Sequence, residues 1–185
     1  CTEFDIAFFG IVRVGAVATI LNSAYQQREI AHQINDSGAE TLIVYEALEG
    51  IAKEAQYATP RLRRLIVIRP TSKAPQSFWG LLENAPVKPP SVSINPQEDL
   101  AALPYSSGTT GLSKGVMFTH HNLTCNLEQF AQRPGEGASF LRDDVFLVHL
   151  PLFHIYGLEV LMNAVIHVGA TQVLMGCFDI ELFLN

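Results

Sequence analysis

Residues 103–115 read Leu-Pro-Tyr-Ser-Ser-Gly-Thr-Thr-Gly-Leu-Ser-Lys-Gly. Seven central positions, residues 106–112, hold four hydroxyl side chains, two glycines and a single apolar residue. Apolar runs precede this segment (residues 100–103) and follow it (residues 116–118), so we expect a polar loop between two strands. A loop of this composition adds little to a core, and its chemistry suits the binding of an anion.

The loop carries the groups that a phosphate chain needs. Gly108 and Gly111 lack a Cβ, so the backbone can adopt a positive φ and turn its N–H groups toward a ligand. Lys114 adds a positive charge on a flexible stem. Hydroxyl donors come from Ser106, Ser107, Thr109 and Thr110. We interpret the segment as a triphosphate-binding loop.

The loop is not a Walker A motif. That motif has four residues between its glycines and a Gly-Lys-Ser/Thr run that begins a helix. Here two residues separate Gly108 from Gly111, and Lys114 precedes Gly-Val-Met-Phe, which is typical of a strand. A flexible Ser/Gly linker is the alternative, and a lysine held between two apolar strands argues against it.

Composition excludes several classes of protein. The chain has 185 residues, 48% hydrophobic and 16% charged, with a net charge of −6. Without a basic run, nucleic acid is not an expected partner. Apolar stretches are too short to span a bilayer, and the start does not resemble a signal peptide. The three cysteines are far apart and predict a reducing compartment, the cytoplasm.

The order of predicted elements indicates an α/β protein with a mostly parallel sheet and helices on both faces, because helices alternate with apolar strands. The segment 70–96 is rich in proline and predicts a surface excursion rather than a domain boundary. The predicted helices cover residues 4–17, 28–37, 46–57, 78–83, 120–132 and 154–167. The predicted strands cover residues 16–21, 41–45, 65–68, 100–103, 114–118, 144–150 and 171–175. Those at 41–45, 65–68 and 171–175, and the helix at 4–17, are expected to be largely buried.

Three segments resemble one family. Residues 106–115, followed by Val-Met-Phe-Thr-His, look like the AMP-binding signature of adenylate-forming enzymes: acyl-CoA synthetases, 4-coumarate–CoA ligases, beetle luciferases and peptide-synthetase adenylation domains. Residues 150–157, Leu-Pro-Leu-Phe-His-Ile-Tyr-Gly, resemble the family's Pro-x-Phe-His-x-x-Gly segment. Residues 13–22 are similar to a segment early in the large domain. Within the family, the chain resembles the acyl-CoA synthetase and 4-coumarate–CoA ligase branch. Ser113 stands where most members have proline.

The resemblance implies that residues 1–185 form part of a large N-terminal AMP-binding domain, truncated at both ends and without the C-terminal subdomain. In such enzymes a carboxylate attacks the α-phosphate of Mg-ATP, which gives acyl-AMP and pyrophosphate, and the CoA thiol then takes the acyl group. The expected substrate is a long-chain fatty acid or a hydroxycinnamate, and this chain alone is expected to be inactive. A luciferase-like oxygenase that uses an acyl-adenylate and a non-enzymatic nucleotide-binding remnant remain as alternatives.

The resemblance also implies roles for particular residues. His154 is a catalytic candidate at the carboxylate, with Tyr156 and Gly157 beside the acyl group. The alternative for His154 is a structural role, in which its ring hydrogen-bonds to backbone at the start of a helix. The alternative for Tyr156 is a place in the core. Lys114 is the second catalytic candidate. The phosphate contacts fall to Ser106, Ser107, Gly108, Thr109, Thr110, Gly111 and Lys114.

The partners implied are ATP with Mg²⁺, CoA and a small carboxylic acid. No metal site is expected in the chain itself, because the adjacent His120 and His121 have no third ligand nearby. Peripheral contact with a membrane stays open for an enzyme of lipid substrates.

Overall fold

The computed structural model describes residues 1–106, 112–131, 140–176 and 178–184. At the centre lies a sheet built on β4 (Leu100–Ser106). Its parallel neighbour is β1 (Ala18–Ile20), paired so that Ala18 lies opposite Ala102. Two short antiparallel strands, β5 (Lys114–Gly115) and β6 (Phe118–Thr119), also pair with β4. The predicted polar loop therefore connects two strands of one sheet.

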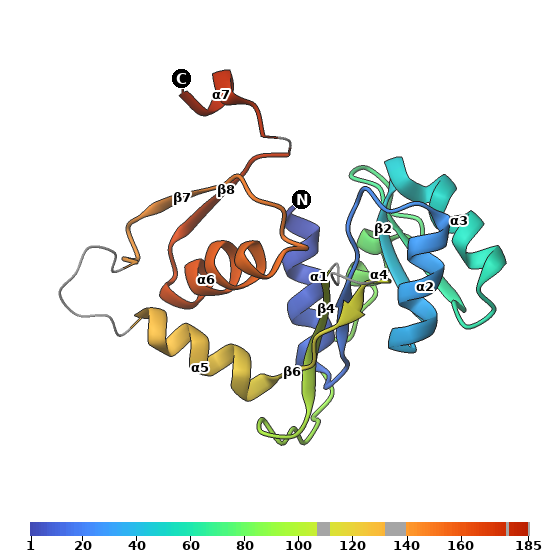
Figure 1. Cartoon of the computed structure of the whole chain (residues 1–185), viewed down its shortest axis with the longest axis horizontal. Coiled ribbons are helices and arrows are strands. Elements are labelled where there is room, and N and C mark those ends of the chain that lie inside the picture. The colour runs from blue at the N-terminus through green and yellow to red at the C-terminus, as the bar shows by residue number, and fades with distance from the viewer. Residues whose placement is uncertain (107–111, 132–139, 177, 185) are drawn as a thin grey trace.

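A second group of elements lies to one side of this sheet, on the right in Figure 1. Its parallel pair consists of β2 (Thr41–Tyr45) and β3 (Arg64–Ile68). Helix α2 (Gln27–Ser37) packs on α3 (Glu49–Ala58), and the buried side chains there are Ile30, Ile34, Ala55 and Leu62. A 3₁₀ turn, η1 (Glu46–Leu48), precedes α3, and the short helix α4 (Phe78–Glu83) contacts β3.

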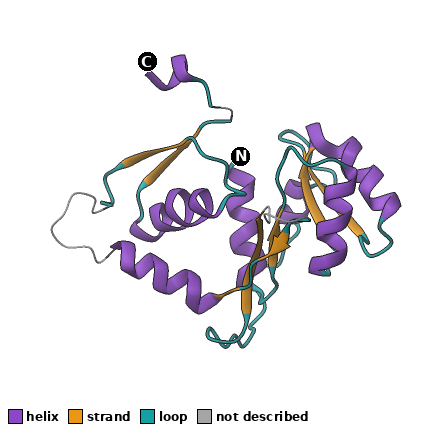
Figure 2. Ribbon diagram, in the orientation of Figure 1, coloured by secondary structure: helices purple, strands orange, loops and turns teal. Residues whose placement is uncertain are grey.

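The third group lies on the opposite side. Its parallel pair is β7 (Val145–Val148) and β8 (Thr171–Leu174). The helices here are α5 (His120–Ala131), the π-helical segment η2 (Gly157–Asn163), α6 (Ala164–Val168) and α7 (Ile180–Leu184). Figure 2 shows strands in three places, each with helices beside it. The α/β class is therefore as predicted.

Sequence features fix several of the element ends. Gly38 ends α2 with φ of 74°, and its N–H donates to the Ile34 carbonyl. Gly169 ends α6 in the same left-handed conformation, which only glycine adopts without a steric penalty. Thr119 and Asn122 cap α5 reciprocally: Thr119 Oγ1 accepts from the Asn122 N–H, and Asn122 Oδ1 accepts from the Thr119 N–H.

The central core lies between the middle sheet and the helices that flank it. Its buried members are Phe8, Ala18, Ile20, Ala101, Ala102, Leu123, Leu158 and Met162. The first helix, α1 (Thr2–Arg13), contributes Phe8 to it. The prediction that this helix is largely buried was wrong, because Ile6 and Phe9 on its other face are more than a third exposed.

The strands differ from prediction in their pairing, their burial and their bounds. The strands described here form three separate sheets, and the antiparallel strands β5 and β6 join the central one. The strands β2 and β8 are only half-buried, since each belongs to a two-stranded sheet whose outer edge has no partner among the described residues. Residues 114–118 do not form one strand, because β5 ends at Gly115 and β6 begins at Phe118, and the pairing of β6 with β4 is irregular between Leu100 and Ala102.

Candidate functional site

The described ends of the polar loop face each other. Ser106, at the end of β4, lies opposite Lys114, the first residue of β5, and Tyr105 lies opposite Gly115. The Val116 N–H donates to the Pro104 carbonyl at 2.8 Å and closes the hairpin below the loop. The Lys114 side chain is exposed to solvent. The other predicted phosphate ligands, Ser107, Gly108, Thr109, Thr110 and Gly111, lie outside the described residues.

His154 stands at the start of the helix that runs through η2 and α6. Its ring Nδ1 accepts a hydrogen bond from the Tyr156 N–H at 3.2 Å, and its own N–H donates to the Pro151 carbonyl at 3.1 Å. The ring therefore caps the helix, which is one of the two roles considered from sequence. Because Nδ1 accepts, the proton of the neutral ring is on Nε2, and the His154 side chain is exposed. The capping bond leaves Nε2 as a hydrogen-bond donor.

Gly157 is buried against the turn that precedes the helix. A Cβ at this position would lie 2.2 Å from the Pro151 carbonyl oxygen, so only glycine fits. Gly157 is not among the residues that line the cavity described next. Its position indicates a packing role in holding the turn that carries His154.

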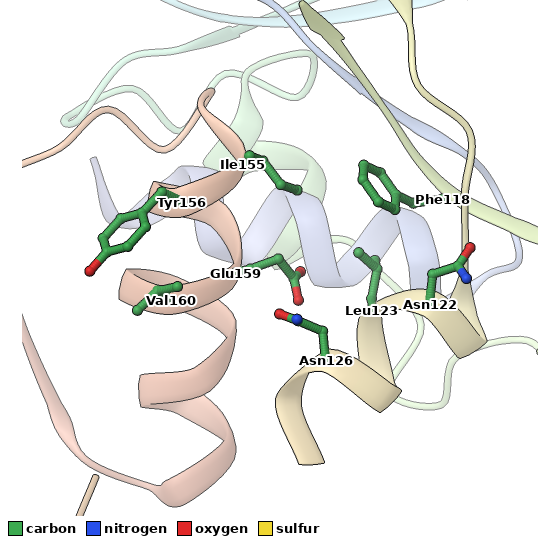
Figure 3. A pocket seen from close by; sticks show the side chains of 8 residues that line it. All are labelled: Phe118, Asn122, Leu123, Asn126, Ile155, Tyr156, Glu159 and Val160. Atoms are coloured by element: carbon green, nitrogen blue, oxygen red, sulfur yellow. The ribbon is translucent and has the colours of Figure 1, made fainter. Parts of the chain in front are cut away.

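A cavity of about 300 Å³ opens between α5, β6 and the helix that follows His154. Tyr156, about half exposed, lies on one wall of the cavity. Phe118, from β6, lines another side (Figure 3). The lining residues are Phe118, Asn122, Leu123, Asn126, Ile155, Tyr156, Glu159 and Val160. Phe118 follows Lys114 by four positions and Ile155 follows His154 directly. The cavity therefore adjoins both segments predicted to be functional.

Glu159 is a polar residue of this cavity that the sequence prediction missed. The side chain is 5% exposed and points from η2 toward α5, where Asn126 lies (Figure 3). Asn163 Nδ2 donates to Glu159 Oε1 at 2.5 Å, and Oε2 has no partner among the described residues. Burial raises the Glu159 pKa from 4.5 to about 7, against the opposing effect of the Asn163 hydrogen bond. A lone Glu within the apolar run Leu-Glu-Val-Leu was the signal that could have found it.

This raised pKa makes the stability of the chain depend on pH. The folded state holds the Glu159 proton up to about pH 7, whereas the unfolded chain releases it near pH 4.5. The contribution to stability is complete below pH 4.5 and is lost as the pH rises through 7. We expect the variant E159Q to lack this loss. Between pH 4.5 and 8, the unfolding free energy of the wild type should fall by about 3 kcal/mol more than that of E159Q.

The measurement is urea unfolding of wild type and E159Q at a series of pH values. The matched control is E98Q, at an exposed carboxylate. If wild type and E159Q show parallel pH profiles, the Glu159 carboxyl does not titrate as the geometry requires.

In the ranges given above, no group of three or more His, Cys, Asp or Glu side chains is arranged to hold a metal ion. Within those same ranges no helix combines the length and apolar character needed to cross a membrane.

Comparison with known proteins identifies the family. The profile of the AMP-binding enzyme family matches residues 1–183, and the chain belongs to that family. Among curated relatives, 4-coumarate–CoA ligase 1 from Solanum tuberosum is 38% identical over 187 residues, which cover 100% of this chain and 33% of the relative. The chain thus spans about a third of the length of the curated relatives it matches.

Solved structures agree with this fold. A long-chain-fatty-acid–CoA ligase from Archaeoglobus fulgidus superposes with a TM-score of 0.86 at 31% identity, covering 98% of this chain and 35% of that one. ATP-bound MatB from Rhodopseudomonas palustris gives a TM-score of 0.84 at 28% identity, covering 100% of this chain and 35% of that one.

Proposed function

We propose that this chain is part of an ATP-dependent carboxylate–CoA ligase that forms an acyl-adenylate and passes the acyl group to CoA. The observation that carries the proposal is the pairing of Ser106 with Lys114 at the ends of the polar loop, together with a cavity lined by Phe118, four positions after Lys114, and by Ile155, the residue after His154. Membership of the AMP-binding enzyme family supports it. The names of the relatives, which are CoA ligases of an aromatic acid and of long-chain fatty acids, support the reaction class.

The loop would hold the triphosphate while the carboxylate attacks. In this proposal Lys114 and the hydroxyl of Ser106 contact the β- and γ-phosphates from opposite strands of the hairpin, and negative charge that builds on the departing pyrophosphate is stabilised by the ammonium group. The loop residues Ser107, Gly108, Thr109, Thr110 and Gly111 would complete the anion site. Mg²⁺ would arrive with ATP and offset charge on the phosphates.

The carboxylate end of the acid would lie at His154. Its Nε2–H is free of the capping bond and can donate to a carboxylate oxygen, which orients the acid for attack on the α-phosphate. The acyl group would extend along Tyr156 into the cavity, whose wall is largely apolar. A cavity of about 300 Å³ suits a hydroxycinnamate or one segment of a long-chain fatty acid.

The experiment uses the longest gene product that contains these 185 residues. Mg-ATP and CoA are supplied with a mixture of hydroxycinnamic acids and fatty acids of several lengths, and products are identified by mass. An acyl-CoA supports the proposal and names the acid. Acyl-AMP without acyl-CoA keeps the adenylation step and refutes CoA as the acceptor, which is the result a luciferase-like enzyme would give. No adenylate from any acid refutes the proposal and favours a non-enzymatic nucleotide-binding protein.

His154 allows capping and substrate contact to be separated. We expect H154A to raise KM for the acid and lower kcat/KM about tenfold or more, because a charge-assisted hydrogen bond is lost. The variant H154N is the matched control, since asparagine is a good N-cap and restores the helix start but not the Nε2–H donor. Equal kcat/KM for H154N and wild type would show that the histidine acts only as a cap.

A further inference from the structure

One face of α2 holds the central sheet through polar side chains. Gln33 is fully buried, and its Nε2 donates to Thr19 Oγ1 at 2.8 Å and to the Ile20 carbonyl at 3.1 Å. His32 lies one residue before Gln33, and Asp36 lies three residues after it. His32 and Asp36 are on the same side of the helix, because positions i and i+4 share a face. These two side chains contact the chain on either side of the proposed phosphate-binding loop, at Ser113 and at Tyr105.

His32 contacts the residue next to Lys114. Its Nε2 lies 3.0 Å from the Ser113 carbonyl oxygen, across 81 positions of sequence. A carbonyl oxygen can only accept, so Nε2 carries the proton and donates it. Ser113 has no ring to fix its backbone φ, so this hydrogen bond is a tertiary restraint on the segment from which Lys114 leaves the loop.

Asp36 holds the other strand of the hairpin. The Tyr105 hydroxyl donates to Asp36 Oδ2 at 2.6 Å, and burial together with the adjacent Asp36 carboxylate raises the Tyr105 pKa, so the donor stays protonated. The Tyr105 ring also lies against Gly115, where an added Cβ would be 3.1 Å from the ring. The strand before the loop, through Tyr105, and the residue just before the strand that follows it, Ser113, are thus both fastened to one helix face, with His32 the contact closest to Lys114.

We propose that His32 is a positioning residue for nucleotide binding: by holding the Ser113 carbonyl it keeps Lys114 in the geometry that meets the phosphates. The inference rests on the proposed function of the loop. His32 does not touch the nucleotide in this proposal. Loss of its hydrogen bond lets the Ser113–Lys114 segment sample other conformations, so the cost appears when ATP binds and orders it.

The test measures the KM for ATP and kcat in the longest gene product that contains the chain. We expect H32A to raise KM for ATP about fivefold, the effect of one hydrogen bond, and to leave kcat within about twofold. The variant H32Q, whose amide can still donate to the Ser113 carbonyl, is expected to recover at least half of the lost affinity. Asn35, exposed on the same helix three positions after His32, gives the matched control N35A, which should match wild type.

A second measurement does not depend on turnover. Trypsin cleaves after lysine, and the Lys114–Gly115 bond lies within the segment that His32 restrains. Limited digestion followed by mass analysis should show this bond cut about fivefold faster in H32A than in wild type, with H32Q between them. Unchanged KM and an unchanged rate of cleavage in H32A would overturn the inference. So would an H32A variant whose kcat falls while KM stays constant.

Failure of this inference can be told apart from failure of the proposed function. If K114A binds and uses ATP as wild type does, the loop is not the phosphate site and both fail. If K114A loses ATP-dependent activity while H32A and wild type agree in KM and proteolysis, the proposed function stands and the role of His32 is refuted.

Discussion

Replacing Lys114 with alanine should reduce acid-dependent exchange of pyrophosphate into ATP by about 10²- to 10³-fold, the effect typical of removing one group that stabilises charge in a transition state. Lys114 lies opposite Ser106 across the hairpin and its side chain is exposed, so the substitution removes a charge without opening the core. We therefore expect the unfolding free energy of K114A to stay within about 0.5 kcal/mol of wild type. The exchange assay is run on the longest gene product that contains the chain.

The matched control is K88A, at an exposed lysine in the proline-rich segment. It removes the same charge from the protein and should leave exchange unchanged. Equal losses in K114A and K88A would mean that net charge, rather than a phosphate contact, is responsible. A K114A variant with wild-type exchange would refute the assignment of the loop.

Replacing Gly157 with alanine should destabilise the fold by about 3 kcal/mol, at the upper end of what one forced methyl group costs in a packed interior. The added Cβ would meet the Pro151 carbonyl oxygen at 2.2 Å and its carbon at 2.8 Å, so backbone rather than a flexible side chain must move. His154 is hydrogen-bonded to the same Pro151 carbonyl, so the shift also reaches the proposed substrate contact. Urea unfolding measures the first effect.

Gly50 gives the control for this substitution. It lies within α3, and a Cβ there would have no heavy atom within 4 Å. G50A should therefore stabilise the helix by about 0.5–1 kcal/mol, because alanine favours helix over glycine. If G157A unfolds at the same urea concentration as wild type, the turn before the helix is not held by the close approach that the structure shows.

Local patterns were enough to predict most elements. The strand at Thr41–Tyr45 and the helix at Phe78–Glu83 have the predicted bounds, because a β-branched run and a Ser77 N-cap, whose Oγ accepts from the Gly80 N–H, are local signals. A polar loop between two strands could be predicted for the same reason, whereas the antiparallel pairing of those strands was not. The α/β class followed from the alternation of elements and is confirmed by the solved structures.

Features set by distant contacts could not be predicted. The apolar pattern predicted a helix over residues 154–167, and residues 157–163 are π-helical. No pattern of residues in the sequence distinguishes such a wider helical segment from a regular α-helix. The burial of Glu159 depends on α5, which packs against it from more than 25 positions earlier in sequence. The hydrogen bond of His32 to Ser113 spans 81 positions and has no sequence signature.

The pairing of β1 with β4 has a consequence for how the chain acquires its fold during synthesis. Residues 18–20 find their parallel partner only at residues 102–104, whereas β2 and β3 are joined by a single crossover within residues 41–68. Long loops close more slowly than short ones, so the β2–β3 unit is expected to form while the ribosome is still translating the proline-rich segment. The central sheet, and with it the hairpin that displays Lys114, is then assembled after the β2–β3 unit, onto a helix α2 that is already in place.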